Sequence, residues 1–319
     1  MEEESMSGNL NKVLIAIDGS EESLAVVRYA SEKLSPATTN VTLFHVMSKV
    51  PEVFWDMEKD PAWLEKVEAV RVFQEKQEEI ITAFIQRCQR IFGTSGFSEA
   101  SVSSRIARQQ NGIARDLVAE AQKRYDVLII GRGKAGSLTN MPLGGVASKI
   151  LNAALTPAIW LVGSSTTQTG RVLIALDSSE NSLQSVKHAG KMLSNSDSSI
   201  TLFHAVRGLT ITMEGFEDLF PAAYRKSFMG EAEPEILSAL KLAQLWLIKM
   251  DISPDRISTK TVIGVRSRAA AILEEAISGE YDTIVMGRRG VSEVMDFSMG
   301  RVTNKLTQLA RDHALWIVG

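Results

Sequence analysis

Two aspartates and two glycine-rich segments are the parts of this 319-residue chain whose residue types and positions could do chemistry. Asp18 and Asp177 each follow an apolar run of the kind that forms a buried strand. A carboxylate in that position can accept hydrogen bonds from ribose hydroxyls or an adenine amine, while glycines let backbone N–H groups approach phosphates closely. The combination suggests a nucleotide that spans a carboxylate and a glycine-rich loop.

The first glycine-rich segment follows the apolar run 127–130. Its glycines are Gly131, Gly133, Gly136, Gly144 and Gly145, and the last two open a helical pattern. The first three have the spacing of the dinucleotide fingerprint G-x-G-x-x-G, but that fingerprint follows the first strand of a unit and leads directly into a helix. These glycines follow a fourth predicted strand, so we discount the match. Basic residues that would add positive charge near a phosphate are Arg132, Lys134, Arg288 and Arg289.

The second half of the chain repeats the first. Residues 281–319 match residues 125–163 at a constant offset of 156, which pairs Gly131 with Gly287, Gly144 with Gly300, Lys149 with Lys305, Trp160 with Trp316 and Gly163 with Gly319. Asp18 pairs with Asp177, and His45 with His204, at an offset of 159. A constant offset over a whole strand–helix–strand unit indicates internal duplication.

Strand and helix patterns alternate in both halves. Strands are predicted over 12–17, 41–47, 102–107, 127–130 and 158–162, and over 171–176, 200–206 and 256–262. Helices are predicted over 62–92, 112–123, 234–250 and 267–278, and irregular connections over 50–60 and 207–233. Such alternation predicts an α/β fold in which each half is a parallel sheet with helices on both faces.

Length and composition indicate two globular domains. We divide the chain into a disordered tail (1–11), a first domain (12–163), a polar linker (164–170) and a second domain (171–319). The net charge of −3 argues against nucleic acid as the main partner, and no apolar run is long enough to span a membrane. The single cysteine, Cys88, excludes an intramolecular disulfide framework and a cysteine-rich zinc site. We therefore expect a cytoplasmic protein.

Three motifs in the same order in both halves resemble the universal stress protein family. They are the aspartate after the first strand (IDGSEES in the first half), the second strand (LFHV in the first half, LFHA in the second) and the glycine loop after the fourth strand. The chain is similar to a tandem member of that family. The resemblance implies two Rossmann-like domains, each with a five-stranded parallel sheet, that pair within the chain through the last strands, which carry Trp160 and Trp316. It also implies a role in the stress response.

The resemblance also implies a phosphate-binding loop for ATP, with Mg²⁺ accompanying the nucleotide. The family loop is G-x-x-G, nine residues, then Gly and Ser or Thr. In the second half Gly287, Gly290 and Gly300 fit this spacing, and Arg301 stands where Ser or Thr is expected.

The first half departs from the loop pattern at two places. Gly131 and Gly144 keep their separation, but Gly133 lies one residue early and Gly145 replaces the Ser or Thr. The resemblance further implies that Asp18 and Asp177 meet the ribose and adenine. The residue after the second-strand histidine, Val46 or Ala205, would then lie near adenine.

Three kinds of function remain open. The first is a module that binds ATP or a related adenine nucleotide without efficient catalysis. The second is an interaction or dimerisation protein whose degenerate loops bind no nucleotide, and further association into a homo-oligomer stays open. The third is an adenine-nucleotide enzyme, which we rank last because S-G-G-x-D-S, H-x-G-H and a base–nucleophile pair are missing. We expect no catalytic or metal-binding residues and at most slow ATP hydrolysis.

The motif residues also have simpler interpretations. Asp18 and Asp177 could only shape the turn before a helix, and the glycines could only allow close packing of helix on strand. His45 and His204, inside apolar strands, would then be core histidines with one satisfied nitrogen.

Overall fold

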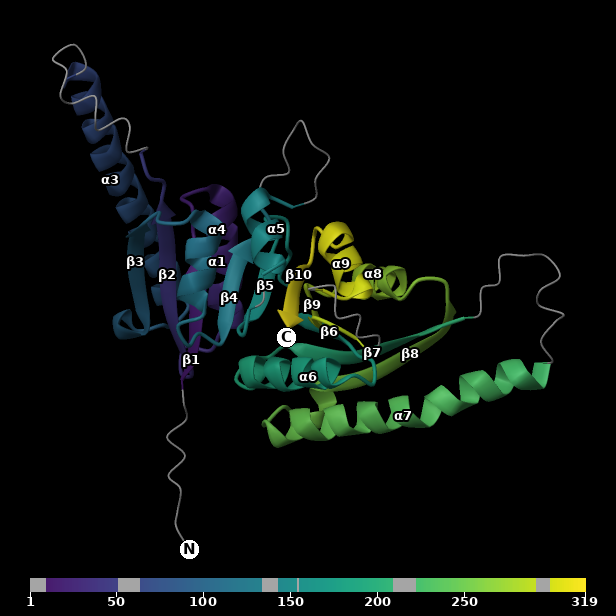
Figure 1. Ribbon diagram of the computed structural model, residues 1–319. Coiled ribbons are helices and arrows are strands. Elements are labelled where there is room, and N and C mark those ends of the chain that lie inside the picture. The colour runs from purple at the N-terminus through teal and green to yellow at the C-terminus, as the bar shows by residue number, and fades with distance from the viewer. Residues whose placement is uncertain (1–9, 51–63, 134–142, 154, 209–221, 291–298) are drawn as a thin grey trace, which may run out of the picture.

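The computed structural model describes residues 10–50, 64–133, 143–153, 155–208, 222–290 and 299–319. Figure 1 shows the first half of the chain (purple to teal) beside the second half (green to yellow). The first half has β1 (Asn11–Ala16), β2 (Thr39–Met47), β3 (Val102–Arg108), β4 (Val127–Gly131) and β5 (Ala158–Val162). The second half has β6 (Arg171–Ala175), β7 (Ser199–Arg207), β8 (Ile257–Val265), β9 (Thr283–Gly287) and β10 (Ala314–Val318).

The ten strands form one sheet in the order β3-β2-β1-β4-β5-β10-β9-β6-β7-β8. Neighbouring strands within each half are parallel. The halves meet where β5 and β10 pair antiparallel, with Trp160 opposite Trp316. Both tryptophans are fully buried in a hydrophobic core that contains residues of both halves.

Helices cover both faces of the sheet. They are α1 (Glu21–Lys33), α3 (Leu64–Thr94), α4 (Ile113–Ala121), α5 (Gly145–Leu151), α6 (Glu180–Leu193), α7 (Ala222–Lys249), α8 (Arg268–Ser278) and α9 (Arg301–Leu309). Successive strand residues point to opposite faces, so Val13 and Ile15 join the core under α1, α3, α6 and α7, whereas Leu14 joins the core under α4, α5, α8 and α9. The predicted α/β class is confirmed.

The outer strands explain a weak point in the sequence pattern. β3 and β8 lie at the two ends of the sheet, and most of their residues are half-buried or exposed. An edge strand can carry polar side chains that a central strand cannot. The polar run 102–107 is therefore a strand, as predicted.

The connection before α7 differs from the prediction. The sequence indicated irregular chain over 207–233 and a helix from Pro234, but α7 begins at Ala222 and contains Pro234. That prediction is wrong for 222–233. Pro234 removes one hydrogen bond from the helix, while the alanine, lysine, methionine and glutamate residues before it favour helix strongly enough to continue through it.

Other predicted segments lie partly outside the described residues. These are residues 1–9 of the tail and residues 51–60 of the predicted irregular connection. Asn11, the last residue of the predicted tail, is buried and begins β1. None of the helices in the described ranges has the length and apolar character needed to cross a membrane.

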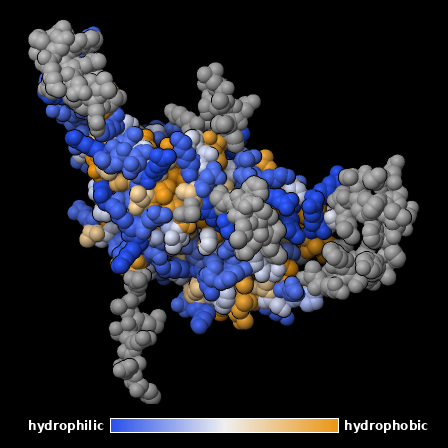
Figure 2. Space-filling view, in the orientation of Figure 1, coloured by the Kyte–Doolittle hydropathy of each residue, from blue (hydrophilic) through white to orange (hydrophobic). Residues whose placement is uncertain are grey.

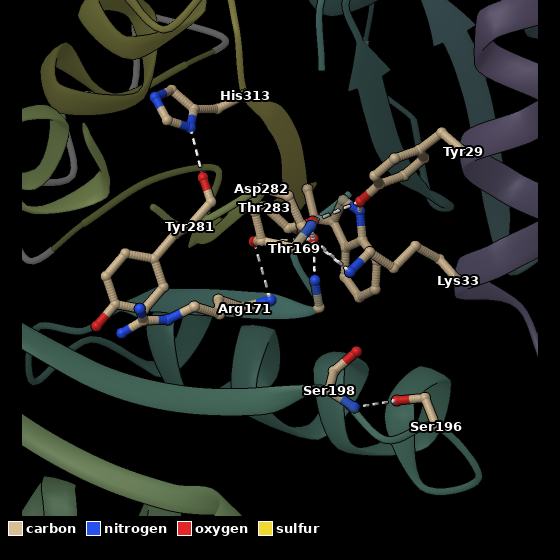
Figure 3. A network of polar contacts seen from close by, with 12 residues as sticks. Tyr29, Lys33, Thr169, Arg171, Ser196, Ser198, Tyr281, Asp282, Thr283 and His313 are labelled. Carbon is tan, nitrogen blue, oxygen red and sulfur yellow. Dashed lines mark hydrogen bonds and ion pairs between the residues drawn. The ribbon is translucent and has the colours of Figure 1, made fainter. Parts of the chain in front are cut away.

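A buried carboxylate ties the linker to both halves. Asp282, at 0% exposure, accepts hydrogen bonds from the backbone N–H groups of Thr169 (2.9 Å) and Gly170 (2.7 Å). It also forms an ion pair with Lys33 of α1, at 2.9 Å between the charged atoms. Figure 3 shows these groups converging on Asp282 beside Tyr29 and Thr283. Because Lys33 and the linker reach the same carboxylate, Asp282 helps to hold the halves together.

Candidate functional site

A pocket of about 1010 Å³ opens in the first half, at the carboxyl ends of β1, β2 and β4. The sheet order places β2 and β4 on either side of β1, so the direction in which successive strands are added reverses between β1 and β4. Clefts of open parallel sheets form at such switch points. Six predicted site residues line this pocket: Asp18, Val46, Gly131, Gly133, Gly144 and Gly145.

Asp18 is held in place by the start of α1. The backbone N–H and the hydroxyl of Ser20 donate to Asp18 Oδ1 at 3.0 and 2.5 Å, and the Ser23 hydroxyl donates to the same oxygen. Ser20 also caps α1 by accepting from the Ser23 N–H. Burial acts to raise the pKa of Asp18, but the hydrogen bonds from Ser20 and Ser23 outweigh it and leave the pKa below its ordinary value. The side chain shapes the turn and also presents an ionised carboxylate to the pocket.

The glycines allow the two ends of the first loop to touch. Gly133 has φ of +73°, a conformation that residues with a Cβ avoid. A Cβ at Gly133 would lie 3.2 Å from Gly144 Cα, and a Cβ at Gly144 would lie 3.2 Å from the Arg132 carbonyl oxygen. The Gly144 N–H donates to that oxygen at 2.8 Å. Larger side chains at these two positions would separate the two ends of the loop, so the glycines are needed for the shape of this part of the pocket.

The pocket also has a wall that the sequence motifs do not indicate. One side of α3 contributes Phe73, Gln74, Gln77, Ile80 and Ile81. Phe73 and Ile80 are 60% and 51% exposed, although the sequence pattern placed both on the core side of the helix. Their separation of seven residues, with glutamines between them, is the signal that could have indicated a second apolar surface above the core.

His45 also lines the pocket. It is half-buried, and its Nδ1–H donates to the Ile17 carbonyl at 2.8 Å, since a carbonyl can only accept. This bond fixes the ring and leaves Nε2 as the acceptor nitrogen of the neutral form. The histidine thus has one satisfied nitrogen, as the simpler interpretation expected, and it borders the pocket as well.

Two arginines predicted beside a phosphate lie elsewhere. Arg132 is buried and donates to the carbonyls of Thr307 (2.7 Å) and Ala310 at the end of α9, in the other half. Arg288 is buried and donates to the carbonyl of Leu151 (2.7 Å) at the end of α5. The last carbonyls of a helix have no partners within it, which makes them good acceptors for a guanidinium. The phosphate role predicted for Arg132 and Arg288 is therefore wrong, and Lys134 lies outside the described residues.

The equivalent place in the second half is built from the same turn. The Asp177 carboxylate accepts from the N–H (3.0 Å) and hydroxyl of Ser179, which caps α6. His204 bonds the Leu176 carbonyl through Nδ1 at 2.6 Å, and burial lowers the pKa of His204. Ala205, next in β7, is buried in the core.

The second loop lies against this turn. Gly300 donates its N–H to the Arg288 carbonyl at 2.9 Å, as Gly144 does to Arg132, and Arg301 begins α9 with an exposed side chain. A Cβ at Gly290 would lie 2.5 Å from Asp177 Oδ2, so the loop touches the carboxylate. Gly287 ends β9 close to the first turn of α6. All five predicted residues around Asp177 correspond to positions in the first half, and the equivalent of Gly290, Lys134, lies outside the described residues.

The universal stress protein family model matches this chain twice, over residues 9–159 and 169–311. The chain belongs to the universal stress protein family. Because each half matches separately, it is a tandem universal stress protein, and the resemblance seen in the sequence motifs is confirmed.

Proteins similar to this chain include other universal stress proteins. A universal stress protein of Mycolicibacterium smegmatis is 26% identical over 180 residues, which cover 56% of this chain and 58% of that relative. The similarity thus spans little more than half of the relative's length. The crystal structure of a universal stress protein from Archaeoglobus fulgidus has the same fold, with a TM-score of 0.60 at 15% identity over 97% of this chain and 98% of that one. A universal stress protein solved in complex with cAMP aligns at 22% identity with 47% of this chain and 96% of its own, with a TM-score of 0.34.

Proposed function

We propose that this tandem universal stress protein binds ATP or a related adenine nucleotide in the pocket of its first half and acts as a binding module. Support comes above all from one arrangement: the pocket lies at the switch point of the sheet and is bordered by both the Asp18 carboxylate and the glycine loop. Asp18 would accept from the ribose hydroxyls or the adenine amine. Gly133 and Gly145 would let the phosphates approach the backbone, and Val46 would contact the base.

Charge in the pocket favours a nucleotide that carries its own cation. The charged side chains among the described lining residues are Asp18, Glu22 and Lys49. A triphosphate would add further negative charge, which Mg²⁺ bound to its oxygens would offset. Groups of three or more metal-ligating side chains do not occur in the described ranges, so the phosphates themselves would supply most of the ligands for this ion.

Efficient catalysis is not expected from this pocket. A general base should have a pKa near the working pH, whereas the pKa of Asp18 lies below its ordinary value. The carboxylate is therefore a poor acceptor for a proton from water. Any hydrolysis of ATP should be slow.

The test combines the native ligand with a defined variant. Small molecules released from the denatured, freshly purified protein are identified by mass spectrometry, and binding of Mg²⁺–ATP, ADP and AMP is measured by calorimetry. We expect an adenine nucleotide, with affinity falling about tenfold or more in Asp18→Ala, since hydrogen bonds to a charged group contribute about 1.5–3 kcal/mol. Protein that carries no nucleotide and does not bind any of the three at millimolar concentration would refute the proposal.

A second candidate, association with another protein or another copy of the chain, is favoured by α7. Four large apolar side chains of this helix are exposed: Leu237, Leu242, Leu245 and Ile248. Figure 2 shows hydrophobic residues at the surface over this part of the molecule. Light scattering of the intact chain and of Leu245→Glu would test it, with a fall in mass in the variant as the supporting result.

A further inference from the structure

The two halves differ in how closely the helix after the first strand approaches the fourth strand. In the first half a Cβ at Gly131 would meet Val26 Cγ2 at 3.4 Å, an ordinary contact. In the second half a Cβ at Gly287 would lie 2.9 Å from the backbone carbon of Asn181 and 3.0 Å from the backbone nitrogen of Ser182. The backbone of α6 therefore packs directly on the end of β9. The corresponding gap in the first half is part of the pocket, which is lined there by Glu22, Ser23 and Gly131.

The loops also leave their strands along different paths. Gly133 turns the first loop with a φ of +73°. The equivalent residue in the second half is Arg289, and among the described residues a positive φ without glycine occurs at Arg124, Asp251 and Glu280 but not at Arg289. A residue with a Cβ avoids the left-handed region, so the second loop cannot copy this turn at low cost.

The consequence of the second path is a contact that covers the carboxylate. Gly290 comes so close to Asp177 that a Cβ there would lie 2.5 Å from Oδ2. The other oxygen, Oδ1, accepts from Ser179. The group that would receive a ribose in the second half is therefore occupied by the chain itself.

The two halves also differ at the first residue of the helix that follows each loop. A Cβ at Gly145 would meet no heavy atom within 4 Å among the described residues, so the pocket is open at this point. Arg301 occupies the equivalent position and carries the longest side chain that could stand there.

We infer that this chain binds a single nucleotide, in the first half, and that the equivalent place in the second half is closed by the contact of Gly290 with Asp177. This inference rests on the proposed function and adds where the nucleotide binds and how many nucleotides bind per chain. The second half then serves as support: Arg288 holds the end of α5, whose first residues line the pocket.

The experiment is a pair of identical substitutions at equivalent positions. Asp18→Asn and Asp177→Asn both keep an Oδ1 acceptor for the following serine, so both turns and both caps persist; circular dichroism and the melting temperature verify the fold. Binding of Mg²⁺–ATP to the full chain is measured by calorimetry at known active concentration. We expect one site per chain in the unchanged protein, at least a tenfold loss of affinity in Asp18→Asn, and unchanged affinity and stoichiometry in Asp177→Asn.

The outcomes separate this inference from the function on which it rests. Two sites per chain, or loss of binding in Asp177→Asn with binding retained in Asp18→Asn, would overturn the inference and leave the binding function standing. Absence of binding by ATP, ADP and AMP in the unchanged protein would overturn the function and the inference together.

Discussion

Trp160 and Trp316 stack face to face across the junction of β5 and β10, with ring centroids 3.7 Å apart and planes 4° from parallel. Each indole N–H donates to the opposite half: Trp316 to the Tyr29 hydroxyl at 2.9 Å and Trp160 to His188 Nε2 at 3.0 Å. Tyr29 and His188 are equivalent positions of the repeat, on α1 and α6. The junction is thus nearly two-fold symmetric, with a tyrosine on one side and a histidine on the other.

His188 should make stability depend on pH. Burial, with the positive charge of Lys191, lowers the pKa of His188 to about 4, whereas an unfolded histidine titrates near about 6.5. Between these values the unfolded chain binds a proton that the folded chain does not. The free energy of unfolding therefore has its full value above about pH 6.5 and decreases as the pH falls toward 4. The total decrease due to His188 is at most about 3 kcal/mol.

Urea unfolding at pH 7, 5.5 and 4.5 measures this effect when the unchanged protein is compared with His188→Tyr. The tyrosine matches Tyr29 and cannot titrate in this range. We expect a shallower loss of stability in the variant, while His204 contributes equally to both proteins. Parallel pH profiles would contradict the role of His188.

Asp282 should matter far more to stability than its counterpart Asp126. Asp282→Ala would leave Lys33, which is 4% exposed, buried without its ion-pair partner, and would also release two backbone donors of the linker. Breaking a buried pair in this way costs about 3–5 kcal/mol. The Asp126–Lys191 pair is 36% and 47% exposed, and Asp126 also accepts an exposed hydrogen bond from the Lys12 N–H at 2.8 Å, so Asp126→Ala should cost about 1–2 kcal/mol. Similar losses of unfolding free energy for both variants in chemical denaturation would contradict the role of Asp282 in holding the two halves together.

Arg132 should connect the pocket to the other half. It lies between two pocket glycines and donates to carbonyls at the end of α9, which a lysine cannot bond with the same fork of donors. Arg132→Lys should lower stability by about 1–3 kcal/mol, because buried acceptors lose their partners. It should also weaken nucleotide binding several-fold. If the affinity for nucleotide is unchanged while stability falls as expected, Arg132 stabilises the contact between the two halves but does not affect the pocket.

Gly145 should separate ligand binding from folding. Its Cβ position is open among the described residues, and glycine is about 1 kcal/mol less favourable than alanine within a helix, with leucine close to alanine. Gly145→Leu should therefore keep or raise the melting temperature while filling the pocket and reducing affinity for Mg²⁺–ATP at least tenfold. Arg301→Leu is the matched control and should leave affinity unchanged. Full binding by Gly145→Leu would show that the ligand does not occupy this end of the pocket.

Much of the fold could be predicted because its signals are local. Apolar runs such as 127–130 indicate buried strands whatever surrounds them, and the exact repeat spacing fixed two equivalent halves. The positions of Asp18 and the glycines at the carboxyl ends of β1 and β4 followed from parallel-sheet geometry alone. These inferences need no knowledge of which side chains meet.

The features that were missed depend on contacts between distant segments. The side chains of Arg132 and Arg288 point toward carbonyls at helix ends in the opposite half, and the neighbouring sequence does not indicate these contacts. Phe73 and Ile80 fit a core-facing pattern, yet α3 is long enough to extend along the pocket as well as the core. The early start of α7 could not be predicted because α7 contains Pro234, and a proline usually marks the start or the end of a helix.

The antiparallel pairing of β5 with β10 joins segments of one covalent chain. Dilution therefore cannot separate the halves, and the melting temperature should be independent of protein concentration to the extent that this junction determines it. Two identical subunits related by a two-fold axis would be obliged to place the same residue at both symmetric positions. A single chain has no such obligation, because a mutation changes one copy of a contact and spares the other, and the two halves can therefore diverge independently.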